Sequence, residues 1–130
     1  MDIKKKLVGK TIVGYSLDDA GERLVLLMQD AEPVILETES EGCSHLDGTS
    51  YTWIESLDAP EALLGTVTDV EEIAMPDLGN IDGTRYKGVD EVKYYGLKIT
   101  TDKGRCVIDY RNDSNGYYGG SLEIANPRRP

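Results

Sequence analysis

Hydrophobic and polar positions follow the same order along two stretches of the chain. Each stretch holds three short segments rich in valine, isoleucine and leucine, and the first segment of each begins at a glycine, Gly9 or Gly65. The segments are residues 9–15, 24–30 and 34–38 in the first stretch, and residues 65–70, 97–102 and 106–110 in the second. Short apolar runs of this kind predict β-strands, so each stretch is expected to form an antiparallel meander.

Turn residues separate these segments and support the same interpretation. Gly21 can adopt a positive φ after Asp18, residues 29–33 form a short loop, and Asp102-Lys-Gly104 predicts a hairpin. A last strand is expected within residues 117–124.

These patterns predict one domain over residues 1–130, of the α+β class and mainly β. Two pseudo-repeats, residues 7–41 and 64–111, are expected to form antiparallel meanders in a curved sheet or a partly open barrel. The second repeat contains an additional segment, residues 75–90, whose glycines and polar residues predict a long loop. Loops of this length are often functional.

A short helical insert is expected between the repeats, over residues 52–64. Thr52 and Glu55 have the spacing of a capping box, and Pro60 would fall in a first helical turn. Gly65 is placed as the residue that ends the helix.

Composition indicates a globular cytoplasmic protein. Hydrophobic residues make up 39% of the 130 residues and charged residues 29%. No apolar run approaches the ~20 residues that cross a bilayer, so no membrane association is expected. The two cysteines and the single histidine cannot complete a common zinc site, and neither a metal nor a cofactor is expected.

The net charge of the chain argues against nucleic acid as a partner. At −10, the chain is expected to repel nucleic acid, since such binding requires clustered lysine and arginine. Glu37, Glu39 and Glu41 alternate along one predicted strand and therefore share a face. That face is either a solvated surface or an acidic stripe that binds a protein.

Tyrosines and glycines gather in the last third of the chain. Tyr117 and Tyr118 precede two glycines, and exposed tyrosines give rigid contact area for a protein partner. The alternative is a sheet bend with tyrosines in the core, because the chain has no phenylalanine.

A second possibility combines these tyrosines with a basic residue. Arg111, Asn115 and Tyr95, together with Tyr117 and Tyr118, would bind a phosphate-bearing ligand by charge-assisted hydrogen bonds. In the simpler interpretation, the basic residues of this region are ordinary cross-strand partners of Asp109 and Glu123.

Cys43 and His45 stand two residues apart and suggest a nucleophile and its base. No orienting acid or oxyanion donor can be identified beside them, so no catalytic residue is assigned.

Several of these segments together resemble a known group of sequences. They are Leu7–Ile12, Gly42–Ser44, Trp53–Glu55, Met75–Asp77, Tyr95–Asp102 and Ser114–Gly120. In this combination the chain is similar to an uncharacterised small domain family that is found in bacteriophages and actinobacteria. The resemblance implies no assigned activity.

The leading hypothesis is a non-enzymatic, phage-type inhibitor of bacterial host defence, comparable to an anti-CRISPR protein, that binds a host defence protein or complex. The alternative is a homo-oligomeric sponge for a nucleotide-derived immune signal. A hydrolase that uses Cys43 and His45 is the weaker alternative.

Overall fold

The computed structural model describes residues 2–40, 50–76, 91–114 and 119–125. Two short helical elements and eight strands lie in these ranges. They are α1 (Asp2–Leu7), β1 (Ile12–Leu17), β2 (Arg23–Met28), β3 (Val34–Ser40), β4 (Tyr51–Asp58), the 3-10 helix η1 (Pro60–Leu63), β5 (Val67–Ala74), β6 (Glu91–Thr101), β7 (Gly104–Ser114) and β8 (Gly120–Ile124). Neither described helical element is long and apolar enough to cross a membrane.

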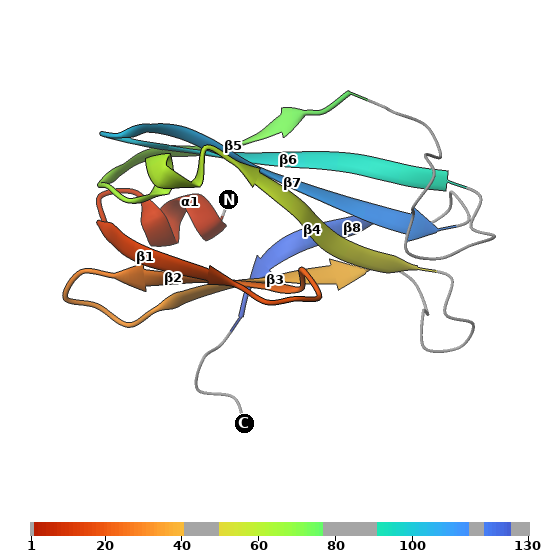
Figure 1. Ribbon diagram of the computed structural model, residues 1–130, viewed down its shortest axis with the longest axis horizontal. Coiled ribbons are helices and arrows are strands. Elements are labelled where there is room, and N and C mark those ends of the chain that lie inside the picture. The colour runs from red at the N-terminus through yellow and green to blue at the C-terminus, as the bar shows by residue number, and fades with distance from the viewer. Residues whose placement is uncertain (1, 41–49, 77–90, 115–118, 126–130) are drawn as a thin grey trace.

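The strands form two antiparallel sheets of four strands each, which lie as two layers (Figure 1). Sheet 1 has the order β1-β2-β3-β8, and sheet 2 has the order β4-β7-β6-β5. The expected mainly-β fold built from antiparallel meanders is confirmed. The described strands do not close into a barrel, and each meander belongs to its own sheet.

The two sheets exchange their fourth strands. Strand β4 follows β3 in the chain but pairs with β7 of sheet 2, whereas β8 follows β7 but pairs with β3 of sheet 1. The first strands of the two meanders also meet, through a bridge between Thr11 and Thr66 whose hydroxyl oxygens lie 2.8 Å apart. The repeated pattern in the sequence therefore corresponds to a repeated topology with swapped ends.

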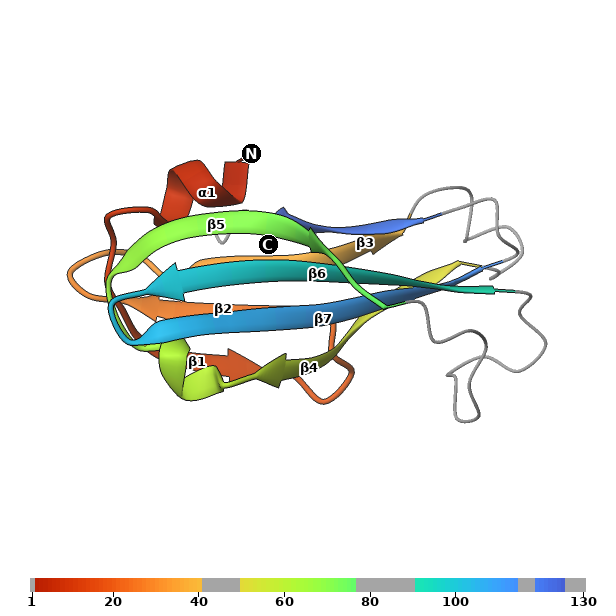
Figure 2. The ribbon, with the colours of Figure 1, turned by 90° about the horizontal axis from the view of Figure 1, so that it is seen from above.

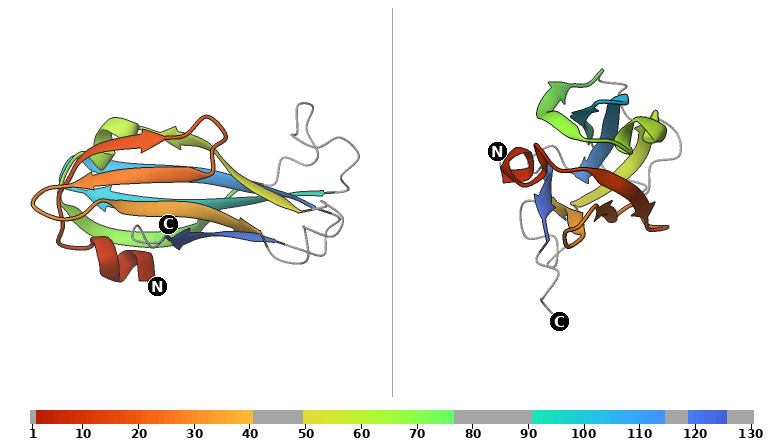
Figure 3. Two further views of the ribbon diagram at one scale, coloured as in Figure 1. Left: turned by 90° about the horizontal axis from the view of Figure 1, so that it is seen from below. Right: turned by 90° about the vertical axis from the view of Figure 1, so that its left-hand side faces the viewer.

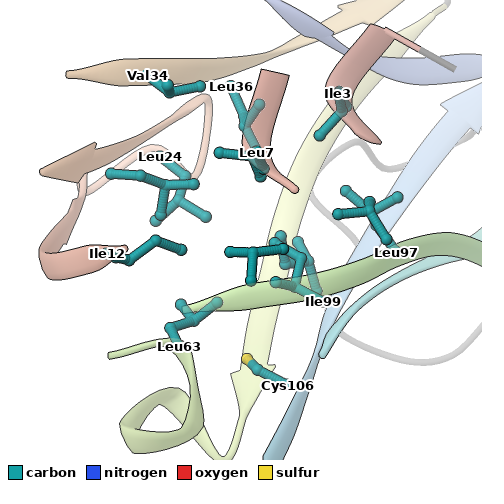
Figure 4. Close-up of a cluster of buried hydrophobic side chains, with 14 of the residues drawn as sticks. Ile3, Leu7, Ile12, Leu24, Val34, Leu36, Leu63, Leu97, Ile99 and Cys106 are labelled. Atoms are coloured by element: carbon teal, nitrogen blue, oxygen red, sulfur yellow. The ribbon is translucent and has the colours of Figure 1, made fainter. Parts of the chain in front are cut away.

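The core lies between the layers and follows the two-residue period of the strands. Sheet 1 contributes Leu24 and Leu36, and sheet 2 contributes Ile99 and Ile108, all with 0% exposure. Figure 4 shows side chains from both sheets and from α1 in one cluster.

Helix α1 covers one open side of the two layers. It lies beside β5 and near β8 (Figure 2), and its Ile3 and Leu7 are buried in the core. Lys4 forms an ion pair of 3.1 Å with Asp69 on β5. Opposite this side, η1 packs on β7 and β6. The end-on view in Figure 3 shows α1 beside the two layers.

The predicted helix over residues 52–64 is wrong for most of its length. Residues Tyr51–Asp58 form strand β4, and only Pro60–Leu63 is helical, with Pro60 in the first turn as expected. The Thr52 hydroxyl donates to the Glu39 carbonyl at 3.0 Å, so it does not cap a helix. Pairing with β7 and burial of alternate side chains override the local capping signal.

Two further differences concern residues near the ends of elements. Helix α1 was not predicted: it has only 6 residues, three of them lysines, and its buried residues Ile3 and Leu7 stand four apart. Gly65 does not end a helix in a left-handed conformation. It is required because a Cβ there would clash with the Asp102 side chain.

The predicted loop over residues 75–90 lies outside the described residues from residue 77 onward.

Replacing a core leucine should lower stability strongly. Leu36→Ala is expected to reduce the free energy of unfolding by about 3 kcal/mol, because it leaves a cavity between the sheets. Leu27→Ala, at a side chain that is 44% exposed on the neighbouring strand, should cost less than about 1 kcal/mol. Urea denaturation of the two variants measures the difference. Equal losses would contradict the placement of Leu36 in the core.

Stability should also fall in alkaline solution. Burial is the main cause that raises the pKa of the Cys106 thiol to about 12, from 9.0, and the pKa of the Tyr110 phenol to about 12, from 10.0. From about pH 9 to about pH 12 the folded chain therefore binds more protons than the unfolded chain, so the free energy of unfolding decreases as pH rises.

Urea unfolding at a series of pH values tests this expectation. Cys106→Val removes the thiol at similar volume and should make the decrease shallower. A free energy of unfolding that stays constant over this range would contradict the burial of both groups.

Candidate functional site: an acidic groove between β3 and β4

Strand β3 is longer than its neighbour β2. The pairing of the two strands begins at Arg23 opposite Glu37, and the Thr38 N–H still donates to the Glu22 carbonyl at 3.0 Å. The turn before β2 is held by the Asp18 carboxylate, which accepts the N–H groups of Glu22 and Arg23 at 2.7 and 3.1 Å. Beyond this point β2 no longer covers the edge of β3, whereas β8 stays paired on the other edge as far as Ser40.

A polar groove lies beside this uncovered edge, with a volume of about 440 Å³. Its walls are the end of β3 and the beginning of β4, so both sheets contribute. The lining residues are Glu22, Arg23, Glu37, Thr38, Glu39, Ser40, Ser50, Tyr51 and Thr52. The lining residues include three carboxylates and one guanidinium, which gives the groove an excess of two negative charges.

Hydrogen bonds fix the β4 wall against β3 and the turn. The Tyr51 hydroxyl donates to Glu22 Oε2 at 2.7 Å. The oxygens Thr52 Oγ1 and Ser40 Oγ lie 2.8 Å apart, and Thr52 also donates to the Glu39 carbonyl. The groove is therefore held open by bonds on both walls.

A buried asparagine stands behind the β4 wall. Asn112 on β7 has 0% exposure, and its Nδ2 donates to Ser50 Oγ at 3.2 Å and to Thr52 Oγ1 at 2.9 Å. Its Oδ1 has no hydrogen-bond partner within the described ranges. A buried amide oxygen without a partner costs stability, so its retention here calls for a reason.

Strands β4 and β8 make a close contact beside the groove. Gly120 on β8 lies against Thr52, and a Cβ at residue 120 would clash with the Thr52 side chain. The Gly120 N–H donates to the Tyr95 hydroxyl at 3.2 Å.

The three carboxylates of the groove differ in their partners. Glu22 accepts the Tyr51 hydroxyl, and Glu37 lies 3.3 Å from Arg23 Nε, a guanidinium whose side chain is 62% exposed. Glu39 is exposed and forms no ion pair with any residue that the structure describes. The residues Glu37 and Glu39, which the sequence placed on one face, do line one site.

The residues proposed for a phosphate-bearing ligand are not brought together. Arg111 lies on the outer face of sheet 2, where its Nε and Nη2 donate to Asp109 at 3.1 and 3.0 Å. The Asp109 hydrogen bond is the main cause that raises the pKa of Arg111. Its guanidinium lies 5.0 Å from the centre of the Tyr94 ring.

Tyr95 points to the opposite face of the sheet. It pairs with Tyr110, and the two rings stack at 5.1 Å between centroids. Arg111 does pair with Asp109, but the two residues lie two apart on β7 and not on neighbouring strands as expected. Glu123 accepts the Ser121 hydroxyl at 2.7 Å.

The remaining candidates lie outside the described residues. They are Glu41, Asn115, Tyr117 and Tyr118, together with Cys43 and His45. The other cysteine, Cys106, is buried, and its raised pKa keeps it a neutral thiol at neutral pH. No group of three potential metal ligands occurs among the residues that the structure describes.

Sequence reasoning missed Glu22, Tyr51, Thr52 and Asn112. The signal for the last two is that they are polar residues at inward positions of strands. Thr52 and Asn112 oppose each other in the β4–β7 register, and both are buried.

The fold and the groove define a two-sheet β protein with a polar groove where strands are exchanged. The chain belongs to the family described as a domain of unknown function, DUF7448, which matches residues 5–124. No curated protein and no solved structure matches the chain.

The contact between Gly120 and Thr52 can be tested by a double-mutant cycle. Gly120→Ala should cost about 2 kcal/mol, because the added methyl group has no space. Combined with Thr52→Ala, which removes the clashing atoms, the cost should be smaller than the sum of the single changes by at least about 0.5 kcal/mol. Ser121→Ala, on the outer face, is the control with little effect. Additive costs in urea denaturation would contradict this contact.

Proposed function

We propose that this protein acts by contact rather than by turnover, as a non-enzymatic inhibitor that binds a basic protein of bacterial host defence. The observation that carries the proposal is the convergence of Glu22, Glu37 and Glu39 on one groove with an excess of negative charge. The partner would present lysine and arginine to this surface.

Electrostatics supports a basic partner. A net charge of −10 accelerates association with a positive surface and disfavours nucleic acid itself. Proteins of host defence that hold DNA or RNA carry such positive surfaces, since phosphate binding requires them. The acidic protein would occupy the surface that otherwise takes nucleic acid.

The negative surface extends beyond the groove along sheet 1. Glu123 on β8 stands directly opposite Glu37 on β3. Like charges in opposite positions destabilise a sheet, and of these two carboxylates only Glu37 has a counterion, Arg23, within the described part of the chain. A basic partner would relieve this repulsion, which supports binding at this face.

The backbone that carries these glutamates is also held in place before binding. Glu37 and Glu39 lie on a strand that is paired with β8, and Glu22 is fixed by Tyr51. Binding to such a surface requires little additional ordering, which favours affinity.

The choice of biological partner rests on the resemblance to a family found in bacteriophages and actinobacteria. A small acidic phage protein would meet such a partner in the cytoplasm of the bacterial host, in a CRISPR complex or a related system. This part of the proposal is associational, since a fold does not fix a function.

The alternative, a sponge for a nucleotide-derived signal, has less support. Arg111 was its cationic residue, and the guanidinium fork already holds the Asp109 carboxylate in a bidentate pair. A phosphate would have to displace this carboxylate.

A charge-neutral double variant tests the proposal. Bacteria with a defined, active CRISPR system are challenged with a targeted phage while they express the protein. The wild-type protein should restore plaque formation, and Glu37→Gln/Glu39→Gln should lose most of this effect. Retention of a purified CRISPR complex on the immobilised protein should decrease in parallel, and should weaken as salt is raised.

The matched control is Glu61→Gln/Glu72→Gln, which changes the net charge equally at two exposed residues away from the groove. It should behave like the wild type. If both double variants lose the effect equally, net charge rather than this surface is responsible. If the wild-type protein leaves immunity intact in every system tested, the inhibitor role is wrong.

A further inference from the structure

We propose that the groove between β3 and β4 is the anchor point for one arginine side chain, carried on an extended segment of the partner. This inference rests on the proposed function, since it names the chemistry of the partner at the same surface. It commits to arginine over lysine and to an extended backbone over a folded one.

Arg23 is an example of a guanidinium that pairs with a carboxylate of the groove. Its Nε approaches Glu37 Oε2 at 3.3 Å, at the mouth of the groove, and most of its side chain remains in solvent. An exposed single-contact pair of this kind contributes little to stability, so it can rearrange when a competing guanidinium arrives.

Acceptors remain for the donors of a second guanidinium. Glu39 has a carboxylate without an ion pair among the described residues, and Glu22 uses Oε2 for Tyr51, which leaves Oε1. Arginine offers five N–H donors in a planar fork and stacks on aromatic rings, whereas lysine offers a compact charge. The three carboxylates reach the groove from β3 and from the turn before β2, and acceptors at separate positions suit the planar group better than a compact charge.

Asn112 fixes the polar wall of the groove from behind. Its amide is fully buried behind Ser50 and Thr52, and it donates to both of these groove-lining hydroxyls. Each hydroxyl oxygen is therefore held in a fixed position as part of the wall.

The shape of the site favours an extended segment. Residues Thr38–Ser40 pair with β8 on one edge, and the last β2 residue in register with β3 is Arg23, opposite Glu37. Among the residues that the structure describes, no strand is in register with Thr38–Ser40 on the other edge, where the Thr38 N–H donates to the Glu22 carbonyl. Strand addition at such an edge is a common mode of peptide recognition. The volume of about 440 Å³ lies within the ~300–1,000 Å³ of ligand sites.

The test uses capped five-residue peptides with glycine and serine around a central residue, which is arginine, lysine or citrulline. Citrulline keeps the shape of arginine and removes its charge. Amide NMR shifts of the full-length protein are followed during titration. The arginine peptide should shift the signals of Thr38–Ser40 and Tyr51 and bind roughly tenfold more tightly than the citrulline peptide. The lysine peptide should bind with intermediate affinity.

Glu39→Gln should weaken binding of the arginine peptide roughly tenfold, because it removes a charged acceptor. Glu61→Gln, an equal charge change outside the groove, should leave binding unchanged, and thermal melts check that both variants fold. Equal affinity for arginine and citrulline, or shifts that map away from β3 and β4, would overturn the inference.

The two proposals fail in different ways. If the peptide binds as expected but host immunity is unaffected, the arginine site stands and the role in defence is wrong. If Glu37→Gln/Glu39→Gln abolishes inhibition but no peptide selectivity is found, the role in defence stands and the groove does not anchor an arginine.

Discussion

Thr52 and Gly120 lie on the two strands that leave their own meander and join the opposite sheet. Each meander needs a fourth strand beside its third, and each receives it from the other half of the chain. The two strands pass so closely that residue 120 has no space for a side chain. Because β8 is paired with β3, the contact between Thr52 and Gly120 lets β4 lie close to β3, beside the groove.

The same exchange explains why polar residues are buried at this end of the molecule. Strands β3, β4, β7 and β8 meet here, and their inward positions carry Ser40, Thr52 and Asn112 rather than leucine or isoleucine. A buried polar network is costly when it is incompletely satisfied, and it restricts the pairing that the strands can adopt. The hydroxyls hold one register, while the carboxylates at the surface favour an added donor. Architecture and recognition thus depend on the same few residues.

The local sequence pattern was sufficient to predict the strands of the two meanders. It was not sufficient to predict the strands that are exchanged between the sheets. Alternation of apolar residues identified the three strands of each repeat, because those strands pair with their sequence neighbours. Strand β4 pairs with β7, and Thr52 lies opposite Asn112, a residue 60 positions later in the chain. The residues near Thr52 and Glu55 therefore gave no sign of this partner, and the spacing of the two residues favoured a helix. The division into two sheets was likewise set by distant pairing, β3 with β8 and β4 with β7.

For the candidate site, the alternation of side chains between the two faces of a strand decided which predicted residues lie together. Glu37 and Glu39 share a face because they are two residues apart, whereas Tyr95 follows the parity of Leu97 and Ile99 and so faces the core. Its neighbour Tyr94 lies beside Arg111 instead. On the outer face of sheet 2, described cations meet acids, as Arg111 meets Asp109 and Lys98 meets Glu71 at 2.6 Å. In the groove, three carboxylates meet one guanidinium. A partner is therefore best sought where the acidic excess lacks internal counterions, and its surface should be positive.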